Sequence, residues 1–161
     1  MKGLAVNPYH THLRVLSLIP KKIMVRTILE FGSGYSTGIF LNKSVYPDLE
    51  NIITFEPNKP WFDRIPTDFR LRGYLCSEDE ALTVSDGKNV DLAFVDGESP
   101  SMRVPTVLHV KKLAKITVLH DSDNFMYSSV FKEFKYVLTD STKSPNTSVF
   151  SDKVDCRDWF S

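Results

Sequence analysis

The sequence has few cysteines and no excess of either charge. Its two cysteines, Cys76 and Cys156, lie far apart and match no CxxC or Cys/His zinc spacing, so we expect reduced, partly buried thiols. Twenty basic residues balance twenty acidic ones, so the protein has no net charge that would attract nucleic acid or anionic lipid. Nucleic acid is therefore not an expected partner, although a local basic patch stays open.

Long apolar runs are also missing. The chain contains no run of about eighteen apolar residues, and residues 1–20 show no apolar core followed by a small-residue cleavage site. We therefore expect a cytoplasmic protein with no membrane partner. The length of 161 residues, 42% of them hydrophobic, fits a single domain, 1–161, that buries a core without disulfides or metals.

Short runs rich in Ile, Val, Leu and Phe alternate with segments of helical length. Each apolar run is typical of a strand buried on both faces, and the runs are 26–31, 51–56, 69–75, 90–96 and 114–121. The helical segments are 36–45, 58–65, 77–84 and 101–113, with Pro105 expected in the first turn of the last one. This alternation predicts an α/β fold with a doubly wound, mostly parallel sheet.

Both ends of the chain depart from this alternation. Residues 125–134 resemble one more amphipathic helix, and two alternating runs around a Ser/Thr/Pro/Asn loop in 135–152 predict an antiparallel hairpin. An N-terminal helical segment, 1–25, precedes the core at 26–151, and its helix is expected at about 9–19, ended by Pro20. The tail, 152–161, is expected to pack on the core or to contact a second copy in a homodimer.

Four carboxylates each fall at the last position of a predicted strand: Glu30, Glu56, Asp96 and Asp121. In an open parallel sheet these strand ends share one edge, where ligands bind. The alternative is that each acidic residue only stabilises a helix N-terminus, by roughly 0.3 to 1 kcal/mol. Four of them together favour a site for a cationic group.

The stretch LEFGSGYSTG, residues 29–38, places two glycines directly after the first apolar run. Gly32 and Gly34 allow a tight turn and a close ligand approach before a helix. Glu30 would repel the diphosphate of a dinucleotide, so a ligand with an ammonium or sulfonium charge and a ribose fits better. Glu56 lies where such folds place the acidic residue that binds the ribose hydroxyls.

These residues resemble the class I S-adenosylmethionine-dependent methyltransferases. ILEFGSGYST is similar to their first motif, IITFEPNKPW to the second, DLAFVDG to the fourth and VLHDSD to the end of the fifth strand, over about residues 25–151. The small O-methyltransferase-like members are the most similar. The resemblance implies a Rossmann-like, seven-stranded sheet with a C-terminal antiparallel hairpin, and methyl transfer from S-adenosylmethionine to a hydroxyl group.

The resemblance also implies roles for individual residues. The methionine part of the cofactor would be lined by Glu30, Gly32, Ser33, Gly34, Ser36 and Thr37, and the ribose would be bound by Glu56. Residues beside the adenine would be Pro57, Ser77 and Glu78, and Asp96 would also contact the cofactor. For Trp61, packing in the core is favoured over stacking on the adenine.

Asp96, His120 and Asp121 form the expected catalytic group. In cation-dependent relatives, residues at these places hold Mg²⁺, which orients a substrate hydroxyl and lowers its pKa. His120 departs from an all-oxygen site, so a softer ion, a general base and a structural histidine all stay open. Asp123 and Asn124 could complete a metal shell, whereas His10 and His12 are expected to be solvated or capping.

The acceptor is expected to be a small molecule or a glycan, because the chain has no large insertion to enclose a substrate. Arg103 and the nearby basic residues His109, Lys111, Lys112 and Lys115 could touch an anionic acceptor, but a solvated helical face is favoured. Two alternatives stay open: a non-catalytic cofactor-binding module of the same fold, and an enzyme that binds NAD or a nucleotide sugar.

Overall fold

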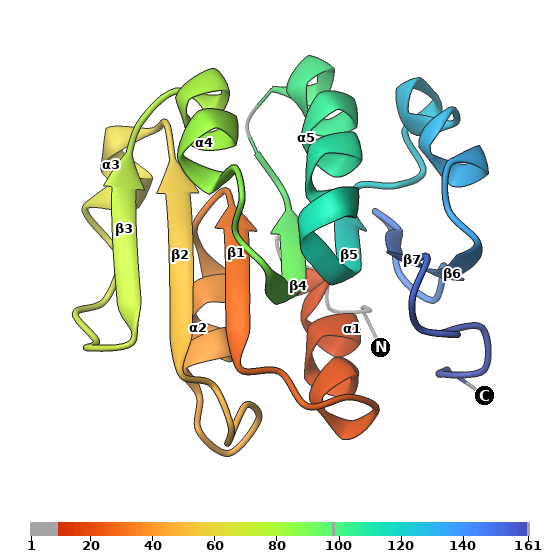
Figure 1. The fold of residues 1–161 in the computed structure, drawn as a ribbon, viewed down its shortest axis with the longest axis horizontal. Helices are drawn as coiled ribbons and strands as arrows, with labels where there is room; N and C mark the ends of the chain where they lie inside the picture. The colour runs from red at the N-terminus through yellow and green to blue at the C-terminus, as the bar shows by residue number, and fades with distance from the viewer. Residues whose placement is uncertain (1–9, 98, 161) are drawn as a thin grey trace, which may run out of the picture.

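The protein is built around a seven-stranded sheet with the order β3-β2-β1-β4-β5-β7-β6 (Figure 1). The computed structural model describes residues 10–97 and 99–160. The strands are β1 (Thr27–Phe31), β2 (Asn51–Glu56), β3 (Leu71–Leu75), β4 (Val90–Val95), β5 (Ala114–His120), β6 (Tyr136–Asp140) and β7 (Thr147–Ser151). Strands β1 to β5 pair in parallel, and β7 lies antiparallel between β5 and β6. The predicted sheet and C-terminal hairpin are confirmed.

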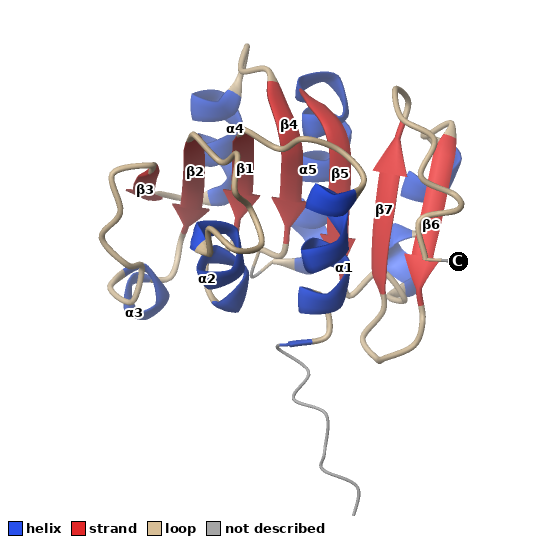
Figure 2. Cartoon of the chain, turned by 90° about the horizontal axis from the view of Figure 1, so that it is seen from below, coloured by secondary structure: helices blue, strands red, loops and turns tan. Residues whose placement is uncertain are grey.

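Helices cover both faces of this sheet. They are α1 (Leu13–Leu18), α2 (Tyr35–Leu41), α3 (Lys59–Phe62), α4 (Glu78–Ser85) and α5 (Pro100–Leu113), with the 3₁₀ turns η2 (Ile19–Lys21), η3 (Phe125–Tyr127) and η4 (Val130–Lys132). Figure 2 shows α1 and α2 on one side and α4 and α5 on the other. Among the described residues, no helix is long and apolar enough to cross a membrane.

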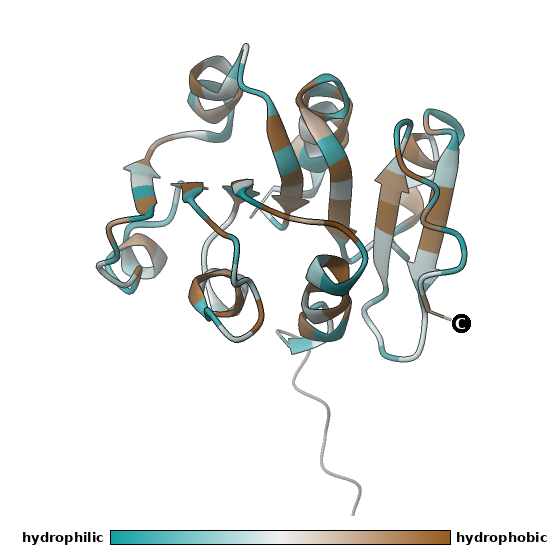
Figure 3. Cartoon of the chain, turned by 60° about the horizontal axis from the view of Figure 1, so that its bottom comes forward, coloured by the Kyte–Doolittle hydropathy of each residue, from teal (hydrophilic) through white to brown (hydrophobic). Residues whose placement is uncertain are grey.

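Successive residues of the central strands pack into two separate hydrophobic cores. Ile28 of β1 and Phe94 of β4 pack with the α1 and α2 side, whereas Leu29 of β1 and Val95 of β4 pack with the α4 and α5 side. The alternation follows from the period of two along a strand, which sends neighbouring side chains to opposite faces. Figure 3 shows the resulting hydrophobic stretches on the central strands. The expectation of strands buried on both faces is correct for β1, β4 and β5.

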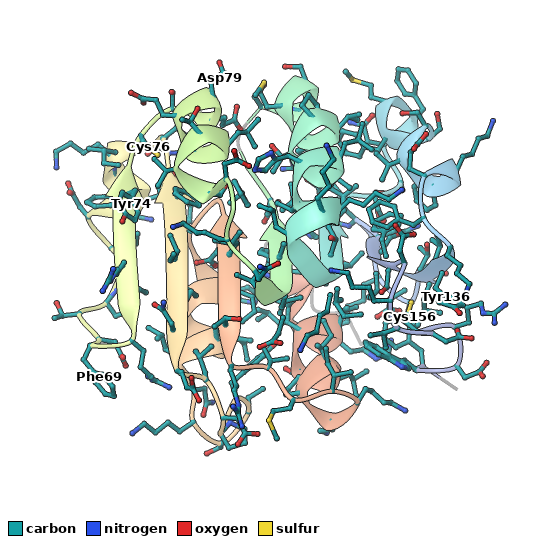
Figure 4. All side chains as sticks on the ribbon, viewed as in Figure 1. Phe69, Tyr74, Cys76, Asp79, Tyr136 and Cys156 are labelled. Carbon is teal, nitrogen blue, oxygen red and sulfur yellow. The ribbon has the colours of Figure 1, made fainter. Side chains whose placement is uncertain are left out.

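The same expectation is wrong for β3, which forms one edge of the sheet. Its residues from Arg72 to Leu75 are exposed, and Figure 4 shows Phe69 and Tyr74 on this side of the molecule. The apolar residues of this segment do not indicate that it lies at the edge of the sheet, because the position of a strand in the sheet depends on which strands pair.

Three helix expectations also need correction. Residues 125–134 form η3 and η4 rather than one helix, with Ser128 and Ser129 between the two turns. Serine side chains bond to nearby backbone groups and so compete with a continuous helix. Pro105 lies inside α5 and not in its first turn. Proline has no N–H to donate to the backbone carbonyl one turn earlier, but Pro105 is exposed, so water can bond to that carbonyl instead. Of the helix predicted at about 9–19, residue 9 lies outside the described residues, and α1 covers only Leu13–Leu18 because the chain tightens into η2 around Pro20.

The two cysteines are free thiols, as predicted. Figure 4 shows Cys76 at the end of β3 and Cys156 beyond the hairpin, at opposite ends of the sheet. Cys156 and Trp159 are buried in the core on the α1 side. The tail therefore packs on the sheet.

Helix α2 is fixed to the sheet by the buried carboxylate of Glu30. Ser36 Oγ donates to Oε1 at 2.5 Å, and the hydroxyls of Thr37 and Thr54 donate to Oε2 at 2.8 and 2.7 Å. Glu30 is fully buried, and this burial raises its pKa to about 7 although the three hydrogen bonds act to lower it. The side chain is therefore partly protonated at neutral pH.

The turn between β1 and α2 depends on close backbone contact with β4. Gly32 has φ 92°, and a Cβ atom at this position would lie 2.5 Å from the Asp96 carbonyl oxygen. No side chain fits this space without moving backbone. The residue therefore brings the ends of β1 and β4 together.

We expect Gly32→Ala to lower the free energy of unfolding by roughly 2 kcal/mol or more, because it adds backbone strain and a clash. Gly38→Ala, in α2, is the matched control: no atom lies near its added Cβ, and helix propensity should stabilise it by roughly 0.5 to 1 kcal/mol. Urea denaturation measures both. Equal stability of the two variants would contradict the proposed contact.

We expect Glu30 to make stability fall as the pH rises from about 4.5 to about 7. The folded chain keeps the Glu30 proton in this range, whereas the unfolded chain releases it, so the contribution is complete below 4.5 and lost through 7. Unfolding free energies from pH 4 to 8 should show this component in the wild type and not in Glu30→Gln, with a difference of up to about 3 kcal/mol. Glu50→Gln, an exposed control, should keep the wild-type dependence.

Candidate functional site

The predicted acidic edge exists at the carboxyl ends of β2, β1, β4 and β5, which are neighbours in the sheet (Figure 1). A cavity of about 360 Å³ opens there. The predicted residues that line it come from the turn after β1 (Gly32, Ser33, Gly34 and Ser36), the end of β2 (Glu56) and the ends of β4 and β5 (Asp96, His120 and Asp121). This volume is within the range of small-molecule sites.

Glu30 and Thr37 do not line this cavity. Glu30 lies beneath the glycine turn, where its carboxylate is occupied by the hydroxyl groups of α2 and β2. Glu30 therefore does not face a ligand cation in this cavity, contrary to the expectation. Its carboxylate shapes the turn from below instead.

Glu56 holds the other side of the glycine turn. Its Oε2 accepts hydrogen bonds from the Ser33 backbone N–H and Oγ, at 2.7 and 2.8 Å. Its Oε1 accepts from the Asn58 N–H at 2.8 Å. The carboxylate is 4% exposed and lies on the cavity wall, fixed at the end of β2.

Trp61 forms a wall of the cavity and does not belong to either core. Its ring lies over Gly34, 3.7 Å from where a Cβ would stand, and the Arg64 guanidinium lies 4.8 Å from the ring centroid. The preference for core packing is therefore wrong. Helix α3 is a single short turn capped by Asn58, which leaves the indole half-buried beside the opening.

Pro57, Ser77 and Glu78 line a second, much smaller cavity of about 10 Å³. It adjoins the first, sharing Gly32 and Gly97 with it, and has an apolar wall. The Glu78 carboxylate accepts a hydrogen bond from the Ser99 N–H at 3.1 Å. This contact joins the start of α4 to the start of α5.

Arg103 is the centre of the charged part of the site. Its guanidinium lies 3.1 Å from the Asp96 carboxylate and 2.8 Å from that of Asp121, and it donates to the carbonyls of Gly97 and His120. Burial acts to lower the pKa of Arg103, but the two aspartates outweigh it and raise the pKa. A permanent cation therefore lies between Asp96 and Asp121, two of the three predicted metal ligands.

The favoured expectation that Arg103 belongs to a solvated helical face is wrong, since Arg103 is 8% exposed. The sequence does carry a signal for its burial. Arg103 shares the i, i+4, i+7 spacing of Val107 and Val110, which are buried on the inner face of α5. Lys112 and Lys115 are exposed as expected.

His120 is buried and bonded through both ring nitrogens. Nδ1 lies 3.0 Å from the Asp96 carboxylate and Nε2 lies 2.8 Å from Thr11 Oγ1. Asp121, the next residue, has φ 55°, a conformation that costs energy in a non-glycine residue and is common at functional sites. Its half-exposed carboxylate faces the cavity.

The expectation that His12 is solvated or caps a helix is also wrong. It is 3% exposed, makes no capping hydrogen bond and lines the cavity, with its ring 4.5 Å from the His120 ring and 5.1 Å from the Phe94 ring. Burial, with the nearby His120, lowers its pKa to about 4. The imidazole is therefore neutral at physiological pH.

Asp123 and Asn124 do not reach the cavity. Asn124 caps η3 by accepting from the Met126 N–H, and the exposed Asp123 accepts from the Asn146 N–H. Neither residue adds a ligand to the group at the ends of β4 and β5. The sharp turn at Asp121 sends the chain away from the site.

No protein-family model matches the chain, and no curated protein matches it. Solved structures do. The O-methyltransferase TomG from Streptomyces achromogenes, in complex with S-adenosylmethionine, has a TM-score of 0.66 at 17% identity, over 94% of this chain and 83% of that one. Cofactor-bound Rv0187 from MTB has a TM-score of 0.69 at 17% identity, over 96% and 84%.

Spermidine synthase from Thermotoga maritima is also similar, with a TM-score of 0.63 at 16% identity over 91% of this chain and 60% of that one. At such identities the likeness concerns the fold and leaves the reaction open. The chain has the Rossmann-like fold of the class I S-adenosylmethionine-dependent O-methyltransferases.

Proposed function

We propose that the protein is an S-adenosylmethionine-dependent methyltransferase that acts on a hydroxyl group. The observation that carries this proposal is the single cavity that joins the glycine turn and Glu56 to Asp96 and Asp121. One end of this cavity suits a methyl donor and the other suits an acceptor. The structure of TomG, which has a similar fold and holds S-adenosylmethionine, supports the choice of donor.

The described residues fit the methyl donor. Gly32 and Gly34 line the cavity without side chains, so the backbone of the turn is open to a ligand. Glu56, fixed at the end of β2, would bind the ribose hydroxyls, and the negative charges at the rim suit an ammonium and a sulfonium group. Pro57, together with Ser77 and Glu78 at the start of α4, would lie beside the adenine, and side chains around the second cavity of about 10 Å³ would have to move to admit the base.

The residues at the ends of β4 and β5 would orient the acceptor. S-adenosylmethionine supplies an activated methyl group, so the protein mainly has to place the acceptor oxygen and remove its proton. Asp121 is the best-placed base because its carboxylate is partly exposed in the cavity. Arg103 holds that carboxylate in place, and His120 positions Asp96 through their hydrogen bond.

A Mg²⁺ ion held by Asp96, His120 and Asp121 does not fit these residues. The Arg103 guanidinium lies between the two carboxylates and bonds to both, so it occupies the place where an ion would bridge Asp96 and Asp121. His120 offers only nitrogen, whereas Mg²⁺ prefers oxygen ligands and water. We therefore assign no catalytic step to Mg²⁺.

The acceptor class follows from the shape of the site. No additional domain encloses the cavity in the described residues, so a small hydroxylated molecule or the end of a glycan can enter. A homodimer that covers the opening is compatible with this surface. A cytoplasmic location agrees with the free thiols.

Two other functions stay open for testing. A non-catalytic module would bind the cofactor and transfer nothing, and an NAD or nucleotide-sugar enzyme would place a diphosphate over the glycine turn. Glu56 and the carboxylates of β4 and β5 oppose a diphosphate at this position. The spermidine synthase likeness shows that this fold also occurs in enzymes named for a different reaction.

We expect Glu56→Gln to weaken binding of S-adenosylhomocysteine about 10-fold or more, because it removes a charged acceptor for the ribose hydroxyls. Glu50→Gln, an exposed residue just before β2, is the control and should bind as the wild type does. Isothermal titration calorimetry measures both. Binding of NAD with no binding of S-adenosylhomocysteine would overturn the choice of cofactor.

We expect Asp121→Asn to lower turnover about 100-fold or more while affinity for S-adenosylhomocysteine changes little, because the proton acceptor is lost but the donor site is kept. Asp123→Asn, two residues away and outside the cavity, should keep wild-type turnover. Transfer of labelled methyl groups to a panel of catechols and sugars provides the assay. Tight cofactor binding with no transfer to any acceptor would favour the non-catalytic module.

A further inference from the structure

His12 has an unusual environment for a buried polar residue. Both of its ring nitrogens are buried, and neither has a hydrogen-bond partner among the described residues. Burial of a polar group without a hydrogen-bond partner destabilises the folded protein. Such a residue in a cavity wall indicates that a ligand completes its bonding.

Two potential metal ligands lie next to His12. One ligand atom from each of His12, Asp96 and His120 can be chosen so that all lie within 4.8 Å of one another. Ligands around a tetrahedral zinc ion, with bonds of about 2.0 to 2.1 Å, stand roughly 3.3 Å apart. Small side-chain movements would therefore close this group around an ion.

The local charge also favours a cation. Asp96 and Asp121 carry two negative charges against the single positive charge of Arg103, which leaves one negative charge in excess. Arg103 approaches Oδ1 of Asp96, the oxygen that also contacts His120. At such a site, the other carboxylate oxygen, Oδ2, would bind the ion.

We propose that His12, Asp96 and His120 form a site for a divalent transition metal such as Zn²⁺ or Co²⁺. Two imidazoles and one carboxylate suit these ions, whereas Mg²⁺ prefers an all-oxygen shell. Thr11 would orient the His120 ring by its hydrogen bond to Nε2, as partners of metal-bound histidines do. This site differs from the predicted group because His12 replaces Asp121.

The position of this metal bears on the acceptor. All three ligands line the main cavity, so an ion there would meet a bound hydroxyl group and lower its pKa. Asp121 stays free of the ion and close to the same cavity. Metal binding itself does not rest on the proposed methyl transfer, because the site consists only of residues of this chain.

Metal binding tests the proposal without a methyl donor or an acceptor. The metal-free protein is titrated with Zn²⁺ against a chromophoric chelator, and with Co²⁺ while its visible absorption is followed. We expect one ion per chain and a Co²⁺ spectrum of low coordination number. His12→Ala and His120→Ala should each weaken Zn²⁺ affinity about 100-fold or more.

Three variants serve as controls. His109→Ala, whose ring bonds Ser85 on another side of α5, and His10→Ala should keep wild-type affinity. Asp121→Asn should weaken affinity far less than His12→Ala, because it removes a nearby charge but no ligand, and this difference separates the site from the one predicted with Asp121. Circular dichroism verifies folding, and His12→Asn replaces His12→Ala if the latter unfolds.

Several outcomes would overturn the proposal: no bound ion in the wild type, wild-type affinity in His12→Asn, or a loss of affinity in Asp121→Asn with none in the His12 variant. X-ray absorption of the zinc-loaded wild type gives a second measure. Two imidazole nitrogens in the shell are expected, and an all-oxygen shell would contradict the site. These results do not depend on whether the protein transfers methyl groups.

Discussion

The parallel pairing of β1 with β4 is the constraint on which the rest of the structure depends. Strand β1 leads to α2 on one face of the sheet, and β4 leads to α5 on the other face. The chain therefore separates at this pair, and a crevice opens at the carboxyl ends of the two strands. The pair closes tightly only because Gly32 has no side chain against the Asp96 carbonyl.

The acidic residues at this edge are each stabilised by different neighbouring groups. Glu30 lies deepest and has its pKa raised by burial, with three hydroxyl groups around it. Glu56 accepts backbone and side-chain hydrogen bonds from the turn that it supports. Asp96 and Asp121 share one arginine. Burial of a carboxylate is costly without such partners, so each solution also fixes the geometry of the cavity.

The sequence predicted the sheet well and the site less completely. Alternating apolar and helical segments, together with the motif order, were sufficient for the strands and for Glu56, Asp96 and Asp121 as cavity residues. The expectation that β3 is buried on both faces is wrong, because the exposure of a strand depends on neighbouring elements that the local sequence does not specify. Trp61 was assigned to the core because a large aromatic residue in a predicted helix has no local signal of its orientation.

The sequence by itself determined the order of elements, the glycine turn and the placement of one carboxylate at each strand end, because these follow from local periodicity and spacing. Only the tertiary structure decided that Arg103 pairs with Asp96 and Asp121, and that His12 lies beside His120. These contacts join residues of distant segments, and their geometry depends on how helices pack on the sheet. That packing places the imidazole of His12, which has no hydrogen-bond partner among the described residues, beside the arginine-paired carboxylate of Asp96.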